Sequence, residues 1–215
     1  MDVKKIYKTR FSEKIKQRFD LWNVLIINFF QKYINEKDTV LDLGCGYGEF
    51  ISQINCRKKY AVDLNSDSEK YLSKKVIFYK QSSTKMSLVK PKLIDKVFVS
   101  NFFEHLTRED IILSIKEIRR ILKKNGQILI LQPNIRLLTA DFWRFFDHIT
   151  PIDDRALEEL FISEGFILKK RIFKFLPYTT KSGLPKSLFI VRIYLGWPFL
   201  WNIFGRQSFL IFEKL

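Results

Sequence analysis

The chain has 215 residues, 47% of them hydrophobic, and carries a formal net charge of +15. This length suits one sizeable core and is short for two, and the hydrophobic content excludes a disordered chain. The basic excess indicates an anionic partner, which charge alone leaves open among nucleic acid, a phospholipid surface and a phosphorylated substrate.

The start of the chain and its two cysteines indicate in which cellular compartment the protein resides. Residues 1–5 lead into charged sequence without the apolar core of an export signal. Cys45 and Cys56 do not have the spacing of metal ligands and are too few for a disulfide framework. We therefore expect a cytoplasmic protein, with peripheral contact at the inner membrane face as a further expectation, and we identify no metal site.

Apolar periodicity predicts an alternation of helices and strands. Residues 8–33 repeat apolar side chains at three- and four-residue steps, which predicts a helix or helix pair before the first strand. Further helices are predicted over Glu49 to Ile54, from Ser66, and from Thr107 to a stop at Asn125-Gly126. The predicted strands are 40–43, 58–62, 76–79, 94–99, 127–131, 167–175 and 207–213.

The most informative motif follows the first predicted strand. Gly44, Gly46 and Gly48 stand at alternate positions after a short apolar run. Without side chains they let a ligand approach the backbone, and a turn that opens a helix favours a polar or nucleotide-like ligand. A dinucleotide fingerprint would need glycine at position 49, where this chain has Glu49.

The pattern Asp42-x-Gly44-x-Gly46-x-Gly48 resembles motif I of class I (Rossmann-like) S-adenosylmethionine (SAM) dependent methyltransferases with small-molecule, glycan or lipid acceptors. The resemblance extends roughly from Val40 to Gly165. It implies SAM as cofactor, S-adenosylhomocysteine as product, and an α/β fold with a seven-stranded, mostly parallel sheet covered by helices on both faces. The implied division is an N-terminal helical extension (1–36), a SAM-binding core (37–175), a helical insertion (176–206) and a last core strand (207–215).

The same resemblance assigns cofactor contacts. Asp42 would order the loop and approach the amino acid end of SAM, while Asp63, about 20 residues downstream, would accept the ribose hydroxyls. Taken alone, Asp63 is better explained as a helix cap or turn residue, and the glycine motif is what favours the cofactor contact. The acid that contacts the adenine amine in the family is missing, and Gln81 or Ser82 is expected to accept there. The predicted cofactor set is Asp42, Gly44, Cys45, Gly46, Tyr47, Gly48, Asp63, Leu64, Gln81, Ser82 and Asn101.

Residues 100–106 follow the fourth predicted strand, at the edge where an open parallel sheet binds ligands. They resemble a segment of small-molecule methyltransferases in which a Glu-His pair opens the next helix, and they lack the Pro-Pro loop of nucleic-acid amine methyltransferases. His105 and His148 are both expected to face the pocket, with a structural hydrogen bond or helix cap as the alternative. His148 is the predicted base, Asp147 its orienting partner and His105 the second choice.

The insertion at 176–206 is rich in aromatic residues but is interrupted by polar residues, glycine and proline, so it is too short to span a membrane. Its aromatic side chains and the neighbouring basic residues fit a surface that meets anionic lipid headgroups. A lid over the acceptor pocket and a homodimer interface are the alternatives. The basic residues are Lys169, Lys170, Arg171, Lys174, Lys181, Lys186, Arg192 and Arg206.

These features predict a SAM-dependent methyltransferase (EC 2.1.1.-) that acts on an oxygen or nitrogen of a small molecule, a glycan or a lipid-linked intermediate. The missing Pro-Pro loop, the pair Asp147-His148 and the aromatic insertion favour this function. An RNA methyltransferase, supported by the basic charge balance, and a SAM-binding subunit without turnover are the alternatives.

Overall fold

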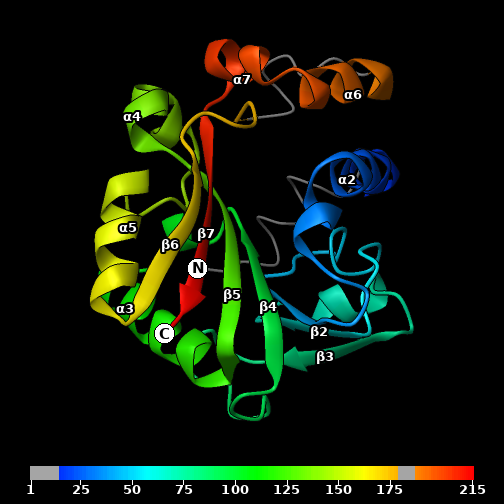
Figure 1. Cartoon of the computed structure of the whole chain (residues 1–215), viewed down its shortest axis with the longest axis vertical. Helices are drawn as coiled ribbons and strands as arrows, with labels where there is room; N and C mark the ends of the chain where they lie inside the picture. The colour runs from blue at the N-terminus through cyan, green and yellow to red at the C-terminus, as the bar shows by residue number, and fades with distance from the viewer. Residues whose placement is uncertain (1–14, 179–186) are drawn as a thin grey trace.

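The computed structural model describes residues 15–178 and 187–215, and a seven-stranded sheet forms its centre (Figure 1). The strands lie in the order β3-β2-β1-β4-β5-β7-β6, with β1 to β5 parallel and β7 antiparallel to both neighbours. Their bounds are Thr39–Leu43 (β1), Lys58–Asp63 (β2), Val76–Lys80 (β3), Ile94–Ser100 (β4), Leu122–Pro133 (β5), Phe166–Ile172 (β6) and Gln207–Lys214 (β7). The predicted Rossmann-like, seven-stranded and mostly parallel sheet is confirmed.

Helices lie on both faces of the sheet, as predicted (Figure 1). The α-helices are Ile15–Asn28 (α2), Arg108–Ile121 (α3), Ile135–Leu138 (α4), Asp154–Ser163 (α5), Leu188–Gly196 (α6) and Pro198–Phe204 (α7). The 3₁₀ helices are Phe30–Tyr33 (η2), Ser66–Lys70 (η3), Phe103–His105 (η4) and Thr139–Arg144 (η5). The predicted helix pair before the first strand is therefore present as α2 and η2, while the beginning of its predicted range lies outside the described residues.

Alternating side chains along β1 divide the core between the two faces. Leu41 and Leu43 pack in the cluster that contains residues of α3 and α5, whereas Val40 packs in the cluster that contains residues of α2 and α6. All five residues of β1 are buried. Because both of its faces are covered, this central strand needs a nearly continuous apolar sequence, and Asp42 is its one charged residue.

The helix predicted over Glu49 to Ile54 is wrong, because this segment forms turns. Ser52 N–H donates to the Gly48 carbonyl, and Ile54 N–H donates to the Phe50 carbonyl, without a continuous helix. The side-chain amide of Gln53 donates to the Glu49 carbonyl at 2.7 Å, so it takes the acceptor that the next helical backbone bond would use. A local side-chain hydrogen bond therefore competes with the helical backbone bond in this short segment.

The predicted start of α3 is confirmed, and its predicted end is wrong. The Thr107 hydroxyl accepts a hydrogen bond from Asp110 N–H at 3.1 Å and caps the helix. The helix ends at Ile121 rather than at Asn125, because Leu122 is already extended and pairs with Ile94 of β4. Asn125 has a φ of +59° and lies at an irregular place within β5.

The insertion before β7 forms two short helices, and α6 packs against α2 (Figure 1). The Tyr194 hydroxyl donates to the Phe175 carbonyl, and the Trp201 indole donates to the Tyr194 carbonyl at 2.8 Å. These bonds attach both helices to the residues after β6. Lys181 and Lys186, which the sequence groups with this basic surface, lie outside the described residues. Among the described residues, no helix has both the length and the apolar character that crossing a bilayer requires.

Candidate active site

The loop after β1 contains three glycines in a backbone conformation that other residues rarely adopt. Gly44, Gly46 and Gly48 have φ values of +69°, +56° and +76°. A Cβ on Gly44 would lie 2.3 Å from the Phe102 ring, and one on Gly48 would lie 2.1 Å from the Leu72 side chain. Side chains therefore pack against Gly44 and Gly48, and only glycine follows this backbone path without strain.

Three carboxylates surround this glycine loop. Asp63 ends β2, and its carboxylate accepts hydrogen bonds from Gly46 N–H at 2.9 Å and from Asn65 N–H at 2.8 Å. Burial raises the pKa of Asp63. Burial raises the pKa of Asp42 well above its ordinary value, and the charges of Glu49 and Asp63 raise it further. Since SAM carries a cationic sulfonium and a cationic amine, this concentration of acids fits that cofactor.

Glu49 also ties the glycine loop to the first helix. Arg18 of α2 donates to the Glu49 carboxylate at 2.5 Å, and Gln53 donates to the Phe19 carbonyl at 3.1 Å. The predicted N-terminal extension therefore contacts the cofactor loop directly.

The other predicted cofactor residues fall into two groups. Cys45 and Tyr47 are buried in the loop itself, whereas Leu64 is 61% exposed beside Asp63. Burial raises the pKa of the Cys45 thiol well above its ordinary value, so this cysteine stays neutral. Tyr47 stacks against Tyr71 with ring centroids 4.4 Å apart. The exposed Leu64 stays a predicted contact of the cofactor.

Gln81 and Ser82, the two residues predicted to accept the adenine amine, lie in the loop after β3. The Gln81 amide donates to the Ser87 hydroxyl at 2.9 Å and accepts from Leu88 N–H at 3.1 Å. Ser82 shares a hydrogen bond with Thr84. Both side chains therefore already have partners within their own loop. Asn101 has a φ of +50° and places its N–H on the Leu131 carbonyl at the end of β5.

A second group of polar residues lies beyond β4; we name Glu104, His105, Asp147 and His148 the acceptor cluster. Glu104 and His105 belong to η4, and the other two belong to the loop before α5. The Glu104 carbonyl accepts from the N–H groups of Ile149 at 2.9 Å and Thr150 at 3.2 Å. These backbone bonds bring the two segments together, so residues more than 40 positions apart share one site.

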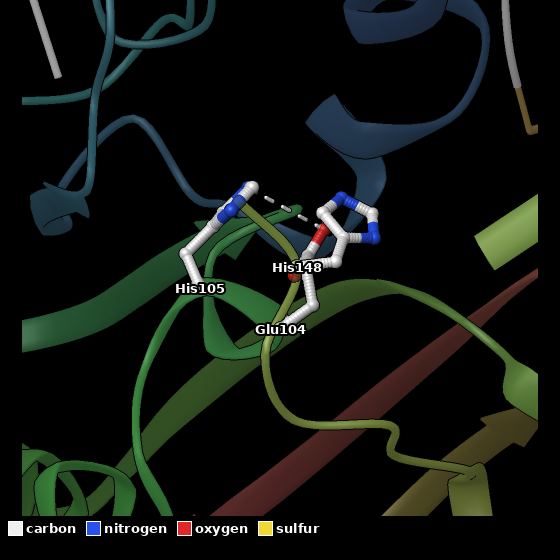
Figure 2. A group of neighbouring side chains, drawn as sticks. All are labelled: Glu104, His105 and His148. Carbon is white, nitrogen blue, oxygen red and sulfur yellow. Dashed lines mark ion pairs between the residues drawn. The ribbon is translucent and has the colours of Figure 1, made fainter. Parts of the chain in front are cut away.

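Within the acceptor cluster, His105 has a carboxylate on each side. Its Nδ1 lies 3.0 Å from the Asp147 carbonyl oxygen and 3.4 Å from the Asp147 carboxylate. Its Nε2 lies 3.9 Å from a Glu104 carboxylate oxygen (Figure 2). The sequence paired Asp147 with His148 as its orienting partner, but these contacts join Asp147 to His105.

His148 is buried, with only 6% of its surface exposed. Its ring lies 4.9 Å from that of His105 and stacks on Phe145 at 5.0 Å. The Tyr178 hydroxyl lies 3.4 Å from both ring nitrogens. Both histidines therefore lie in one cluster, and aromatic rings pack around His148.

Three residues of this site were given no role from the sequence. Glu104 is 1% exposed, and burial raises the pKa of its carboxyl group. Gln132 of β5 donates to Glu104 at 2.9 Å. The Glu-His pair in the sequence was a signal for Glu104, but nothing local distinguishes Gln132 or Tyr178, because both reach the cluster only through the folded sheet edge.

Several solved structures with the same fold are described as methyltransferases. A SAM-dependent methyltransferase from Archaeoglobus fulgidus has a TM-score of 0.67 at 22% identity, covering 95% of this chain and 99% of that one. A putative methyltransferase from Bacillus halodurans has a TM-score of 0.64 at 16% identity, covering 91% and 98%. A complex between the Haloferax volcanii Trm112 methyltransferase activator and a putative methyltransferase has a TM-score of 0.67 at 14% sequence identity. The match covers 96% of this chain and 95% of that one. At these identities the likeness shows the shared fold.

The fold and the glycine loop together define a class I SAM-dependent methyltransferase. The family model described as "Methyltransferase domain" matches residues 15–169, and the chain belongs to this family. A comparison with curated proteins gave no match. The protein is therefore an enzyme that transfers a methyl group from SAM.

Proposed function

We propose that the enzyme methylates an oxygen or nitrogen of a lipid-linked, glycan or small-molecule acceptor that binds against the acceptor cluster. The contact of Phe102 with Gly44 carries this proposal, because it joins the glycine loop to the segment that leads directly into Glu104 and His105. A cofactor on the loop and an acceptor on the cluster would then be neighbours. The predicted cofactor residues and the two histidines thereby form two halves of one active site.

The chemistry requires alignment more than activation. SAM, when bound, supplies a methyl group on a sulfonium that is already activated for displacement. The protein has to align the acceptor atom and exclude water. If the acceptor must lose a proton, an imidazole of the acceptor cluster is positioned to take it, and the contacts of Asp147 make His105 the better-oriented base. His148 then lines the acceptor pocket beside it.

A lipid-linked acceptor is favoured by the outer surface of α6 and α7, which we name the aromatic surface. It lies at the end of the sheet where β5 finishes, since Pro133 of β5 pairs with Gln207 at the start of β7 (Figure 1). Its members are large apolar side chains that are exposed to solvent, with Phe199 the most exposed at 70%. They are Leu188, Phe189, Ile190, Ile193, Trp197, Phe199, Ile203 and Phe204.

Charge supports an anionic bilayer as the partner of this surface. Between Glu164 and Glu213 the sequence contains no acidic residue, and it contains the eight basic residues named above. Exposed aromatic side chains beside basic ones are typical of segments that enter the headgroup region of anionic membranes. A second copy of the chain would bring like charges together across a two-fold axis, which disfavours the homodimer.

The test of the proposed function is transfer of labelled methyl from SAM by the purified protein into a lysate of the source cell. The lysate is then separated into lipid, glycan, RNA, protein and small-molecule fractions. We expect label in the lipid or glycan fraction. Label in RNA would replace this proposal with the RNA methyltransferase, and binding of SAM without any labelled fraction would favour a subunit without turnover.

A further inference from the structure

We propose that Glu104, His105 and His148 bind one divalent transition-metal ion on the acceptor side of the active site. Each residue offers one ligand atom, and the three atoms all lie within 4.8 Å of one another (Figure 2). Two ligands come from η4 and the third from the loop before α5, which backbone bonds to the Glu104 carbonyl hold in place. The site is thus built on fixed backbone.

The partners of these side chains are those of metal ligands. Asp147 lies at the Nδ1 side of His105, an arrangement that favours a proton on Nδ1 and leaves the Nε2 lone pair directed toward Glu104. Gln132 donates to one oxygen of Glu104 and fixes the orientation of its carboxylate. Carboxylate and amide groups in these outer positions orient the imidazole and carboxylate ligands of known metal sites.

Burial of Glu104 supports a bound cation. A carboxylate with 1% exposure is costly to hold without a positive partner. Among residues 15–178 and 187–215, the only ion-pair partner recorded for Glu104 is His105, at 3.9 Å. A divalent ion between the two would neutralise the carboxylate directly and would use both neutral imidazoles.

The donor set indicates the kind of ion. Two imidazoles with one carboxylate suit zinc, manganese, iron or cobalt, whereas magnesium and calcium prefer oxygen donors. Bonds of about 2.0–2.2 Å require the ligand atoms to move closer by roughly 1 Å when an ion binds. Three protein ligands leave a coordination position open for another molecule.

The inference rests on the proposed function for its chemical role. An acceptor hydroxyl at the open position would lose its proton to water more readily, because a bound ion lowers the pKa of a coordinated oxygen. That oxygen would then form the bond to the methyl carbon while the carbon–sulfur bond breaks, and sulfur would keep the electron pair. With an ion bound, the histidines act as ligands and no imidazole base is needed.

The experiment uses untagged protein treated with a chelator and then titrated with Zn²⁺ alone, without any acceptor. Calorimetry is expected to give one ion per chain. Because the chain has only two histidines, the imidazole ¹⁵N resonances report on both ligands without any substitution. Both histidines are expected to shift together and to saturate at one equivalent. Resonances that stay unchanged at saturating Zn²⁺ would overturn the inference.

Variants of the proposed ligands and of Asp147 test the site in the same Zn²⁺ titration. Glu104→Gln and His148→Ala are expected to weaken Zn²⁺ binding more than about 100-fold, and Asp147→Asn about 10–100-fold. Glu109→Gln, an exposed acid on α3, is the matched control and should bind as the unaltered protein does. Equal affinity in all four variants would overturn the site. The binding result is independent of turnover, so methyl transfer that persists in chelator would reject the ion while leaving the proposed function intact.

Discussion

The two halves of the active site are specified in different ways. The glycine loop is one continuous stretch whose geometry depends on backbone conformation, with three glycines at positive φ and Phe102 and Leu72 packed behind them. The acceptor cluster is made of side chains from two segments more than 40 residues apart, joined by the bonds to the Glu104 carbonyl. The geometry of the glycine loop is therefore encoded in one stretch of sequence, whereas the proposed acceptor contacts depend on the assembled sheet edge.

Gly44→Ala should have the largest effect, because it adds a Cβ 2.3 Å from the Phe102 ring at a φ of +69°. We expect a loss of SAM affinity of at least about 100-fold and destabilisation of roughly 2 kcal/mol, from strain and overpacking. Calorimetry with SAM and thermal unfolding measure the two effects. Gly196→Ala is the control, since nothing lies within 4 Å of its Cβ position. Unchanged SAM binding by Gly44→Ala would refute the assignment of the loop.

Trp201→Ala should mainly reduce stability, while Trp197→Ala should mainly reduce membrane binding. The Trp201 ring packs 5.0 Å from Phe175, and its indole donates to the Tyr194 carbonyl, so its loss should destabilise the fold by about 2–3 kcal/mol. Trp197 is 64% exposed. Its loss should weaken binding to phosphatidylglycerol vesicles about tenfold, because burying a large aromatic side chain is worth roughly 1.5 kcal/mol or more.

Vesicle sedimentation measures this binding, with phosphatidylcholine vesicles as the neutral lipid. Leu113→Ala, an exposed apolar residue on α3, is the control for the Trp197 variant. Equal weakening by both variants, or equal binding to both lipids, would contradict the aromatic surface as an anionic membrane contact.

Asp63→Ala tests the cofactor half with a side chain. Its carboxylate accepts from Gly46 N–H and Asn65 N–H, and both donors would lose their partner. We expect SAM affinity to fall by about 1.5–3 kcal/mol, the usual range for hydrogen bonds to a charged group. Glu69→Ala, an exposed acid on η3, should leave the affinity unchanged. A normal SAM titration of the Asp63 variant would remove this residue from the cofactor site.

Asp42→Asn should have the smallest effect on the cofactor-free fold and a diagnostic dependence on pH. Because burial, Glu49 and Asp63 raise the folded-state pKa of Asp42, the folded state binds its proton more tightly than the unfolded state does. Stability from this group therefore falls as the pH rises from the unfolded value near 4 through the folded pKa. The Asn variant should lose this slope and be at least as stable at neutral pH. Urea unfolding at several pH values measures the slope of stability against pH. A slope that is the same in the Asn variant would contradict the raised pKa of Asp42.

The sequence predicted the sheet well because each strand is a short apolar run ended by turn residues. Its failure at residues 49–54 has a local cause, since the Gln53 side chain takes the Glu49 carbonyl that a helix would use. The glycine loop could also be predicted, because its three glycines directly follow an apolar run in one continuous stretch of sequence. Gln132 and Tyr178 could not, because strand and loop residues acquire a role only when the sheet edge brings them to Glu104 and His148.

The most direct test of the two-part site compares SAM affinity and methyl transfer in His148→Asn with those of the unaltered protein. His148 lies in the acceptor cluster, away from the glycine loop's own hydrogen bonds. We predict an unchanged SAM dissociation constant and a loss of methyl transfer into the labelled lysate fraction of about 100-fold or more, because His148 lines the proposed acceptor site and packs against His105. Loss of SAM binding in the folded variant, or full methyl transfer without His148, would contradict the division of the site into a cofactor half and an acceptor half.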